Sequence, residues 1–456
     1  MSSADFKIFN TVSALRITFP LMLAALSGNM MLFVGRFVLA KYDMHSMNAA
    51  ASTVLVCNVF QIAGMSVTTM AEIFVGQYNG LQKFKKVPNA VWQMIWFSLG
   101  LLFVFLPIAF WGGEYLIANK FKALGLSYFQ ITMVFGFLVP LLGALASFFV
   151  GTGNTGPLIV SALIANVLNI ILNIVLVFGY ENIIQPRGAA GSALATGIAL
   201  MVQVLFLFYA FISSENHRQF NTRRVVWDVE QLLACIKVGA PNAISRVIEI
   251  TGWVVIVAYL STVGDDYVTV QTLCHSLIIM FMFTVEGLSK GVTAMVANAI
   301  GRGAMSAIKQ IIFSSVNILI FILVGAWVVL WAAPESTILK LMNQTQFINS
   351  GMVQQVSLAF KGLWVYFAFN GLSLIIWGVL TAGGDTKFIM WTNTISTWLF
   401  AIIPTYIWVA YFPSTASVTF QYIAPVYGFL AFIIVLKRFY SQKWLKINLN
   451  QIVTAI

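Results

Sequence analysis

Long apolar runs alternate with short polar or Gly- and Pro-bearing breaks over the whole chain. A helix needs about 20 apolar residues to cross the hydrocarbon core of a bilayer. The pattern therefore predicts an all-α polytopic membrane protein with twelve transmembrane helices. The predicted spans are 12–40, 47–75, 90–113, 127–150, 157–179, 188–212, 232–260, 269–300, 310–333, 354–382, 387–412 and 419–440, and they contain Pro20, Pro140, Pro241 and Pro404, where kinks are expected.

The longest polar break, residues 213–231, divides the chain near its middle, and landmarks recur in the same order on both sides. Their offsets are 221, 225 and 231 residues, a drift that insertions in loops would produce. The pairs are Pro20 with Pro241, Gly76–Gly80 with Gly301–Gly303, and Gly153–Thr155 with Gly384–Thr386. This order predicts a duplicated six-helix unit.

We expect an N-terminal lobe at 1–212, a cytoplasmic linker at 213–231, a C-terminal lobe at 232–440 and a basic cytoplasmic tail at 441–456. Each half holds an even number of spans, so the two copies are parallel. Transporters of that build bind substrate near the midplane between the lobes and rock the lobes to alternate access. The sequence thus favours a secondary transporter, which we expect to act as a monomer on a small-molecule substrate.

Composition supports the membrane assignment, because 60% of the residues are hydrophobic and only 9% are charged. Fourteen Lys and Arg residues lie in the predicted tails and alternate loops, against five in the opposite loops. By the positive-inside rule, both termini face the cytoplasm of a cell whose inner membrane holds the protein. Topology and anionic headgroups thus explain the net charge of +11, and no nucleic-acid partner is expected.

Ionisable residues inside membrane helices are costly and are therefore candidates for function. Glu249 lies near the middle of the seventh span, eight residues after Pro241. Desolvation there favours the neutral, protonated carboxyl group, as a proton carrier requires. Arg246, three residues earlier on the same helical face, offers the alternative of a static ion pair. We prefer the proton carrier, with the pair as a gate to it.

The other intramembrane polar residues carry less specific signals. Glu286 and Lys290 are four residues apart and are expected to neutralise each other, and Glu72 is expected to reach interfacial water. Amide side chains at helical spacing face the bundle rather than lipid. The full set of candidates for the substrate cavity is Arg36, Glu72, Asn166, Asn169, Asn173, Arg246, Trp253, His275, Glu286 and Lys290.

Taken in order, these features resemble the multidrug and toxic compound extrusion (MATE) transporters of the multidrug/oligosaccharidyl-lipid/polysaccharide exporter superfamily. The resemblance covers essentially the whole chain. It rests on Pro20, Phe33–Arg36, Val75–Gly80, Asn166–Gly179, Gly188–Gly197, the stretch from Gly239 to Glu249, His275 and Gly383–Asp385.

The resemblance implies cation-driven export of amphipathic, often cationic, compounds by alternating access. Glu249 matches the seventh-helix Glu that many members use for coupling, and Tyr366 matches a tenth-helix Tyr near it. Acids of some subgroups are replaced here by Gly35, Asn173 and Asn370. Loss of the tenth-helix acid favours proton coupling through Glu249 over sodium coupling, with Tyr366 and Asn370 beside it. We expect no metal and no cofactor.

Alternatives remain for the substrate and for the class of protein. The basic residues Arg36, Arg246 and Lys290 favour an anionic or zwitterionic metabolite or siderophore as an alternative substrate. A lipid-linked saccharide flippase is the nearest rival within the superfamily. A membrane enzyme would need clustered catalytic groups, whereas His45, His217 and His275 fall on separate elements, and a channel would not need the two-lobe repeat.

Overall fold

The computed structural model describes residues 11–117, 119–180, 183–332, 334, 350–412 and 416–447. Within these ranges the chain is almost entirely helical, apart from an isolated β-bridge between Tyr180 and Ile184. Twelve of the described helical stretches are long and apolar enough to cross a membrane. The predicted all-α class and the number of spans are therefore confirmed.

The helices fall into two sets on either side of α11 (Ser214–Phe220). The first set comprises α1 (Thr11–Tyr42), α2 (Met44–Thr68), α3 (Ala71–Gly80), η1 (Phe84–Lys86), α4 (Val87–Gly100), α5 (Leu102–Pro107), η2 (Ile108–Gly112), α6 (Gly113–Leu116), η3 (Asn119–Phe121), α7 (Lys122–Val134), α8 (Leu138–Thr152), α9 (Gly156–Phe178) and α10 (Gly188–Phe211). The second comprises α12 (Val229–Val263), α13 (Asp265–Gly301), α14 (Met305–Trp327), η4 (Val328–Ala332), α16 (Ser350–Ala382), α17 (Thr386–Thr397), η5 (Trp398–Ile402), α18 (Ile403–Tyr411), η6 (Thr419–Ile423), α19 (Ala424–Tyr440) and η7 (Lys443–Lys446).

The four prolines singled out in the sequence disturb their helices to different degrees. Helices α1 and α12 continue through Pro20 and Pro241. The fourth span is interrupted between α7 and α8, just before Pro140, and a π-helical turn, η5, precedes Pro404. Proline lacks the backbone N–H that would donate to the carbonyl one turn earlier. The two interruptions therefore lie in the turn that precedes each of these prolines, where a helical hydrogen bond is missing.

The predicted second span ends at residue 75, before Gly76–Gly80, and this boundary is wrong. The helix continues through it as α3, and neither glycine has a positive φ. Their missing side chains instead let α3 approach α13 closely, as glycines do at helix contacts in membranes. The true turn follows at Leu81–Lys83, where Gln82 has a φ of 59°.

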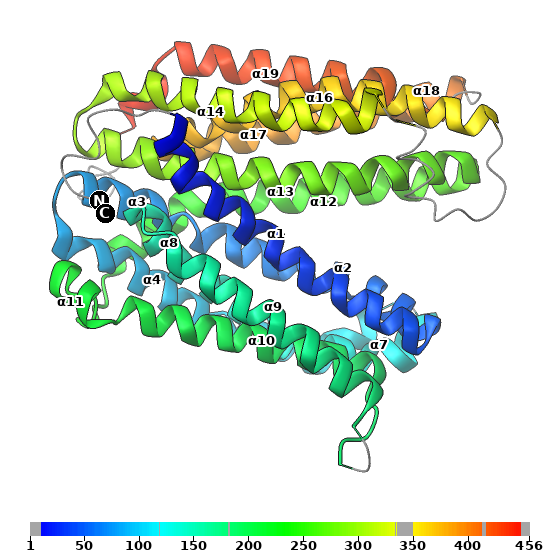
Figure 1. Cartoon of the computed structure of the whole chain (residues 1–456), viewed down its shortest axis with the longest axis horizontal. Helices are drawn as coiled ribbons and strands as arrows, with labels where there is room; N and C mark the ends of the chain where they lie inside the picture. The colour runs from blue at the N-terminus through cyan, green and yellow to red at the C-terminus, as the bar shows by residue number, and fades with distance from the viewer. Residues whose placement is uncertain are drawn as a thin grey trace.

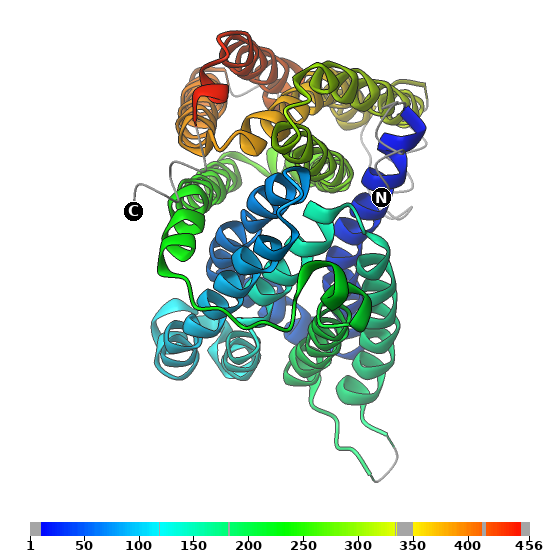
Figure 2. The ribbon, with the colours of Figure 1, turned by 90° about the vertical axis from the view of Figure 1, so that its left-hand side faces the viewer.

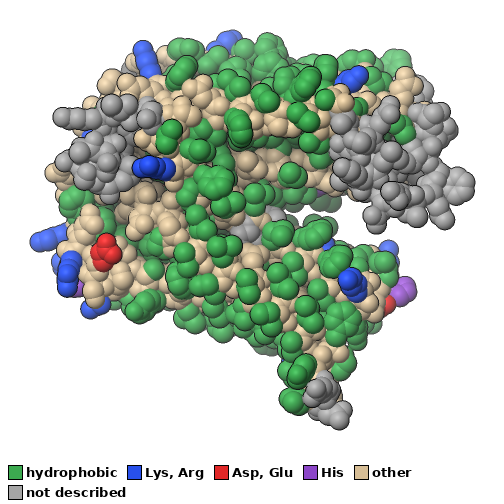
Figure 3. Space-filling model, in the orientation of Figure 1, with side chains coloured by type: hydrophobic (Ala, Val, Ile, Leu, Met, Phe, Trp, Pro, Cys, Tyr) green, Lys and Arg blue, Asp and Glu red, His purple; other side chains and the backbone are tan. Residues whose placement is uncertain are grey.

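The two sets of helices form two halves that meet at one end and diverge toward the other (Figure 1). The halves are joined where α3 and α1 pack against α13 and where α2 packs against α12. Figure 3 shows a cleft between the halves at the opposite end, with hydrophobic side chains around the middle of the molecule. We call the joined end the closed end and the other the open end.

The segment between the halves is shorter than expected, because α12 begins at Val229 rather than at 232. Asp228 caps this helix by accepting a hydrogen bond from the Gln231 backbone N–H at 3.0 Å. Gln93 of α4 holds the linker by donating to the Val226 carbonyl at 2.9 Å and accepting from the Asp228 N–H. The linker therefore crosses the closed end as an anchored segment (Figure 2).

Candidate functional site

The floor of the cleft is a glycine contact between α3 and α13. A Cβ placed on Gly80 would lie 2.3 Å from the Asn298 carbonyl oxygen, and one on Gly301 would lie 2.3 Å from the Gln77 carbonyl oxygen. Gly80 and Gly301 are 221 positions apart in the sequence, as are Gln77 and Asn298. The contact is thus reciprocal about the axis of the repeat, and the counterpart of Gly301 is Gly80 rather than Gly76.

Side-chain amides reinforce this floor. Asn79 donates a hydrogen bond to the Asn298 amide oxygen at 2.7 Å, and Asn298 donates to the Gly151 carbonyl at 2.8 Å. Gln77 reaches the Ala382 carbonyl of the other half at 3.0 Å. These bonds join the two halves at the closed end, so the passage of a solute there requires that they break.

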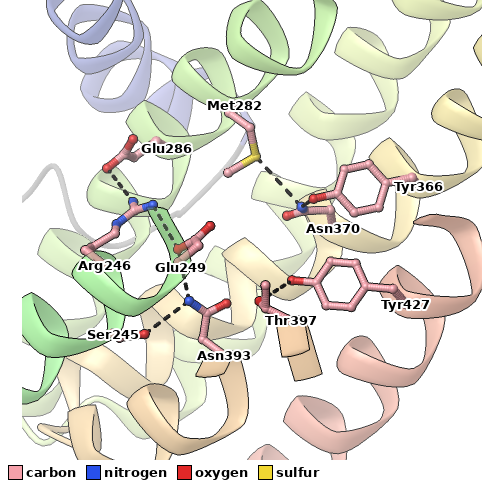
Figure 4. A network of polar contacts seen from close by, with 10 residues as sticks. All are labelled: Ser245, Arg246, Glu249, Met282, Glu286, Tyr366, Asn370, Asn393, Thr397 and Tyr427. Atoms are coloured by element: carbon pink, nitrogen blue, oxygen red, sulfur yellow. Dashed lines mark hydrogen bonds and ion pairs between the residues drawn. The ribbon is translucent and has the colours of Figure 1, made fainter. Parts of the chain in front are cut away.

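A cluster of three charged side chains lies in the C-terminal half (Figure 4). The Arg246 guanidinium lies between two carboxylates, with Nη1 3.6 Å from Glu249 Oε2 and Nη2 3.1 Å from Glu286 Oε1. All three side chains are about one-fifth to one-third exposed. The Arg246–Glu249 ion pair, which the sequence left open as an alternative, is present in the structure, and α13 supplies a second acid to it.

Two uncharged residues that the sequence reading missed complete this cluster. Asn393 of α17 donates hydrogen bonds to Glu249 Oε2 at 3.0 Å and to the Ser245 hydroxyl at 3.1 Å. Asn393 is 6% exposed, so its amide is committed to these partners. The available signal was its span, which contains several Thr, Ser and Asn residues and is the least hydrophobic of the twelve candidates.

Tyr366 and Asn370 of α16 form a second, separate network in the same half. They are hydrogen-bonded to each other, and the Asn370 amide also contacts the Met282 sulfur at 3.8 Å. Among the described residues, Glu249 makes its hydrogen bond to Asn393 and its ion pair with Arg246, and it forms no hydrogen bond with Tyr366. Tyr427 pairs with Thr397 at 3.2 Å nearby, so two tyrosines face the acid without bonding to it.

These tyrosines line a small cavity in the C-terminal half, which we call the C-cavity. Trp253, a candidate for the substrate cavity, also lines it. Its lining residues are Trp253, Ile278, Tyr366, Ala401, Thr405, Thr419, Phe420, Ile423, Ala424 and Tyr427. Most of these are apolar or aromatic, so the C-cavity suits an apolar group.

Three expectations about individual residues change. Glu286 pairs with Arg246 of the neighbouring helix rather than with Lys290, which attracts Glu286 and Glu72 only from beyond ion-pair distance. Glu72 is 3% exposed within the contact of α3 with α13 and so does not reach interfacial water. His275 is exposed on α13 and makes no hydrogen bond to the described part of the chain.

The N-terminal half contains a corresponding cavity, the N-cavity, with a different charge. Its lining residues are Leu32, Gly35, Arg36, Leu39, Ala50, Ala51, Val54, Tyr128, Ser192 and Thr196. They come from the first, second, fourth and sixth spans, and the C-cavity draws on the equivalent spans seven, eight, ten and twelve, together with the eleventh. The two cavities therefore occupy equivalent places in the repeat.

The asparagine ridge of α9 borders the N-cavity. Asn169 and Asn173 are fully buried, which confirms that they face the bundle, whereas Asn166 is half-buried and donates to the Ala162 carbonyl of its own helix. Asn169 donates to the Thr196 hydroxyl at 3.2 Å, and Asn173 donates to the Asn169 carbonyl at 3.0 Å. The amide oxygens of both residues have no hydrogen-bond partner among the described residues.

Comparison with known sequences gives consistent relatives. A family model described as MatE matches residues 20–175 and 241–407, one segment in each half. A probable multidrug resistance protein NorM of Idiomarina loihiensis is 26% identical over 306 residues, which cover 64% of this chain and 62% of that protein. A probable multidrug resistance protein NorM of Pasteurella multocida is 21% identical over 420 residues, covering 88% of this chain and 87% of the relative.

Solved structures share the whole fold. A MATE crystal structure in the straight conformation has a TM-score of 0.82 at 16% identity, covering 95% of this chain and 97% of the other. An outward-facing multidrug resistance transporter has a TM-score of 0.80 at 15% identity, with 95% and 96% covered. At these identities the likeness establishes the arrangement of helices and leaves the chemistry to the residues of this chain.

Proposed function

Because the chain belongs to the MatE family of multidrug and toxic compound extrusion transporters, we propose that it exports amphipathic compounds in exchange for protons entering through Glu249. It is a multi-pass membrane protein with a helical, two-fold repeated architecture. The observation that carries the proposal is the Glu249 carboxylate, which is about one-fifth exposed beside Arg246 and accepts a hydrogen bond from Asn393.

Protonation changes what this cluster binds. An ionised Glu249 is an acceptor only, so it attracts Arg246 and the amide of Asn393. Once protonated it loses its charge, and Arg246 keeps the nearer acid Glu286 at 3.1 Å. A cationic group of a substrate and a proton would compete for the same carboxylate, and this competition is what obliges exchange.

The same arrangement favours protons over sodium. The Arg246 guanidinium lies 3.6 Å from Glu249 and would repel a second fixed cation there, whereas a proton forms a covalent bond with the carboxylate and removes its charge. In the tenth span, the amide of Asn370 contacts Tyr366 and Met282 instead of supplying a second acid.

We propose that the closed end faces the cytoplasm of an inner membrane. The clusters Lys83–Lys86 and Arg218–Arg224 lie at the turns of the closed end, and Lys and Arg side chains gather at that end on the face in Figure 3. By the positive-inside rule this places the cleft open to the outside. We further propose that the protein acts as a monomer.

The test uses purified protein in liposomes with an imposed proton or sodium gradient and a fluorescent cationic dye. Glu249→Gln keeps the shape of the side chain but cannot exchange a proton, so we expect it to abolish pH-gradient-driven dye transport. Glu114→Gln is the matched control, because Glu114 is an exposed acid paired with Lys122. Undiminished pH-driven transport by Glu249→Gln would refute the proposal, as would transport driven by sodium alone.

A further inference from the structure

We propose that the N-cavity holds the carboxylate of a zwitterionic, amphipathic substrate, and that Arg36 binds it. This inference specifies the substrate class of the proposed exporter and rests on that proposed function. It begins from a difference between the two halves. In the C-terminal half Arg246 is flanked by two carboxylates, whereas in the N-terminal half Arg36 makes no ion pair or hydrogen bond within the described residues.

An arginine inside a membrane span without a counter-charge is energetically unfavourable. Arg36 lies within two turns of the end of α1 at Tyr42, is exposed, and lines the N-cavity together with hydroxyl-bearing residues. The buried Tyr128 lines the same cavity. Guanidinium groups bind carboxylates through paired hydrogen bonds, so an anionic group of the substrate would supply the missing partner.

The surroundings of Arg36 supply further hydrogen-bonding groups. Gly35 has no side chain, which lets Ser192 approach the backbone of α1 closely. A Cβ on Gly35 would lie 2.9 Å from the Ser192 hydroxyl oxygen. This hydroxyl has no hydrogen bond to the described residues, so it is available to donate to a carboxylate. The Thr196 hydroxyl is already engaged, since it donates to the Ser192 carbonyl at 3.0 Å and accepts from Asn169.

The unpartnered amide oxygens indicate a zwitterion rather than a dianion. Asn173 Oδ1 is fully buried and lies 3.8 Å from the position of a Cβ on Gly35, which lines the N-cavity. An amide oxygen accepts hydrogen bonds and repels a second anionic group, so it suits an ammonium or amide N–H of the same molecule. Leu32, Leu39 and Val54 complete the lining of the N-cavity.

The experiment measures binding of rhodamine B, which carries a free carboxylate, and of its ethyl ester, which does not. Fluorescence polarisation with the full-length protein in a neutral detergent needs no gradient, so the result is independent of proton coupling. We expect Arg36→Gln to weaken binding of the acid by about tenfold or more and to change binding of the ester by less than about twofold. Arg36→Lys keeps the positive charge but lacks the planar guanidinium, so its affinity for the acid should lie between those of the unmodified protein and Arg36→Gln.

Arg16→Gln is the matched control, because Arg16 is exposed on the same helix about 30 Å away. If Arg36→Gln does not fold, Ser192→Ala carries the test, with an expected loss of about threefold for the acid alone. Equal losses for acid and ester, or no loss for either, would overturn the inference. A lipid phosphate is the rival occupant of the N-cavity. The N-cavity would be assigned to lipid if phosphatidylglycerol competes with the dye, if this competition disappears in Arg36→Gln, and if the ratio of the affinities for acid and ester stays unchanged.

Discussion

At the scale of single residues, partner choice inside the membrane is decided by packing between helices. Glu286 has a lysine four residues ahead on its own helix, a spacing that usually pairs charges. It instead takes Arg246 from α12 at 3.1 Å. The fork of arginine can bind two carboxylates at once, so one guanidinium satisfies Glu249 and Glu286, whereas the compact ammonium of lysine lacks this fixed geometry.

A double-mutant cycle distinguishes the two partners of Glu286. We expect Arg246→Met and Glu286→Gln to be coupled by about 1–2 kcal/mol, because the pair is about one-third exposed and is therefore partly screened. The cycle of Glu286→Gln with Lys290→Met should give less than about 0.5 kcal/mol. Thermal unfolding in detergent measures both, and a larger coupling for Lys290 would contradict the observed pairing.

The sequence predicted the part of this cluster that lies on one helix. Arg246 and Glu249 are three residues apart, and helical geometry alone brings them together. Asn393 lies 144 residues beyond Glu249 and reaches it only because α17 packs against α12. A spacing rule carries no information about such contacts, which is why Glu249 was found and its hydrogen-bond donor was not.

At the scale of helices, the same sequence pattern can mark a turn or a contact. The predicted second span ends at residue 75, before Gly76–Gly80, yet this segment is helical and packs against α13. A hydropathy pattern locates the spans to within a few residues, because any sufficiently long run of apolar residues is stable in the hydrocarbon core. The hydropathy pattern does not indicate which glycines contact another helix, since such contacts depend on how the two helices pack.

This contact predicts how the closed end responds to added volume. Gly80→Ala places a methyl group 2.3 Å from the Asn298 carbonyl, so the helices have to separate by roughly 1 Å to reach an ordinary contact of 3.4 Å. We expect the closed end to loosen, seen as a broader, longer distance distribution between spin labels at the exposed Lys85 and Lys309. Gly325→Ala is the control, because its Cβ would meet no atom within 4 Å. An unchanged distribution for Gly80→Ala would show that the floor is not held by this contact.

At the scale of the whole molecule, the repeat is symmetric in its backbone and asymmetric in its charge. The floor contact is reciprocal at an offset of 221 residues, and both cavities lie among equivalent spans. The C-terminal half holds two acids around Arg246, whereas Arg36 of the N-terminal half forms no ion pair with a described residue. Duplication explains the shared architecture, and substitutions after it account for the division of roles that we propose.

The orientation of the protein in the membrane can be tested directly. Cys57, Cys235 and Cys274 are buried, so a membrane-impermeant maleimide should find little background reactivity. We expect His45→Cys, exposed at the open end, to be labelled in intact cells, and Lys85→Cys, exposed at the closed end, to be labelled only after permeabilisation. We expect this labelling pattern because loops rich in Lys and Arg, such as the turns of the closed end, are retained on the cytoplasmic side. The reverse pattern would place the open cleft toward the cytoplasm and make the state described here the one that loads substrate.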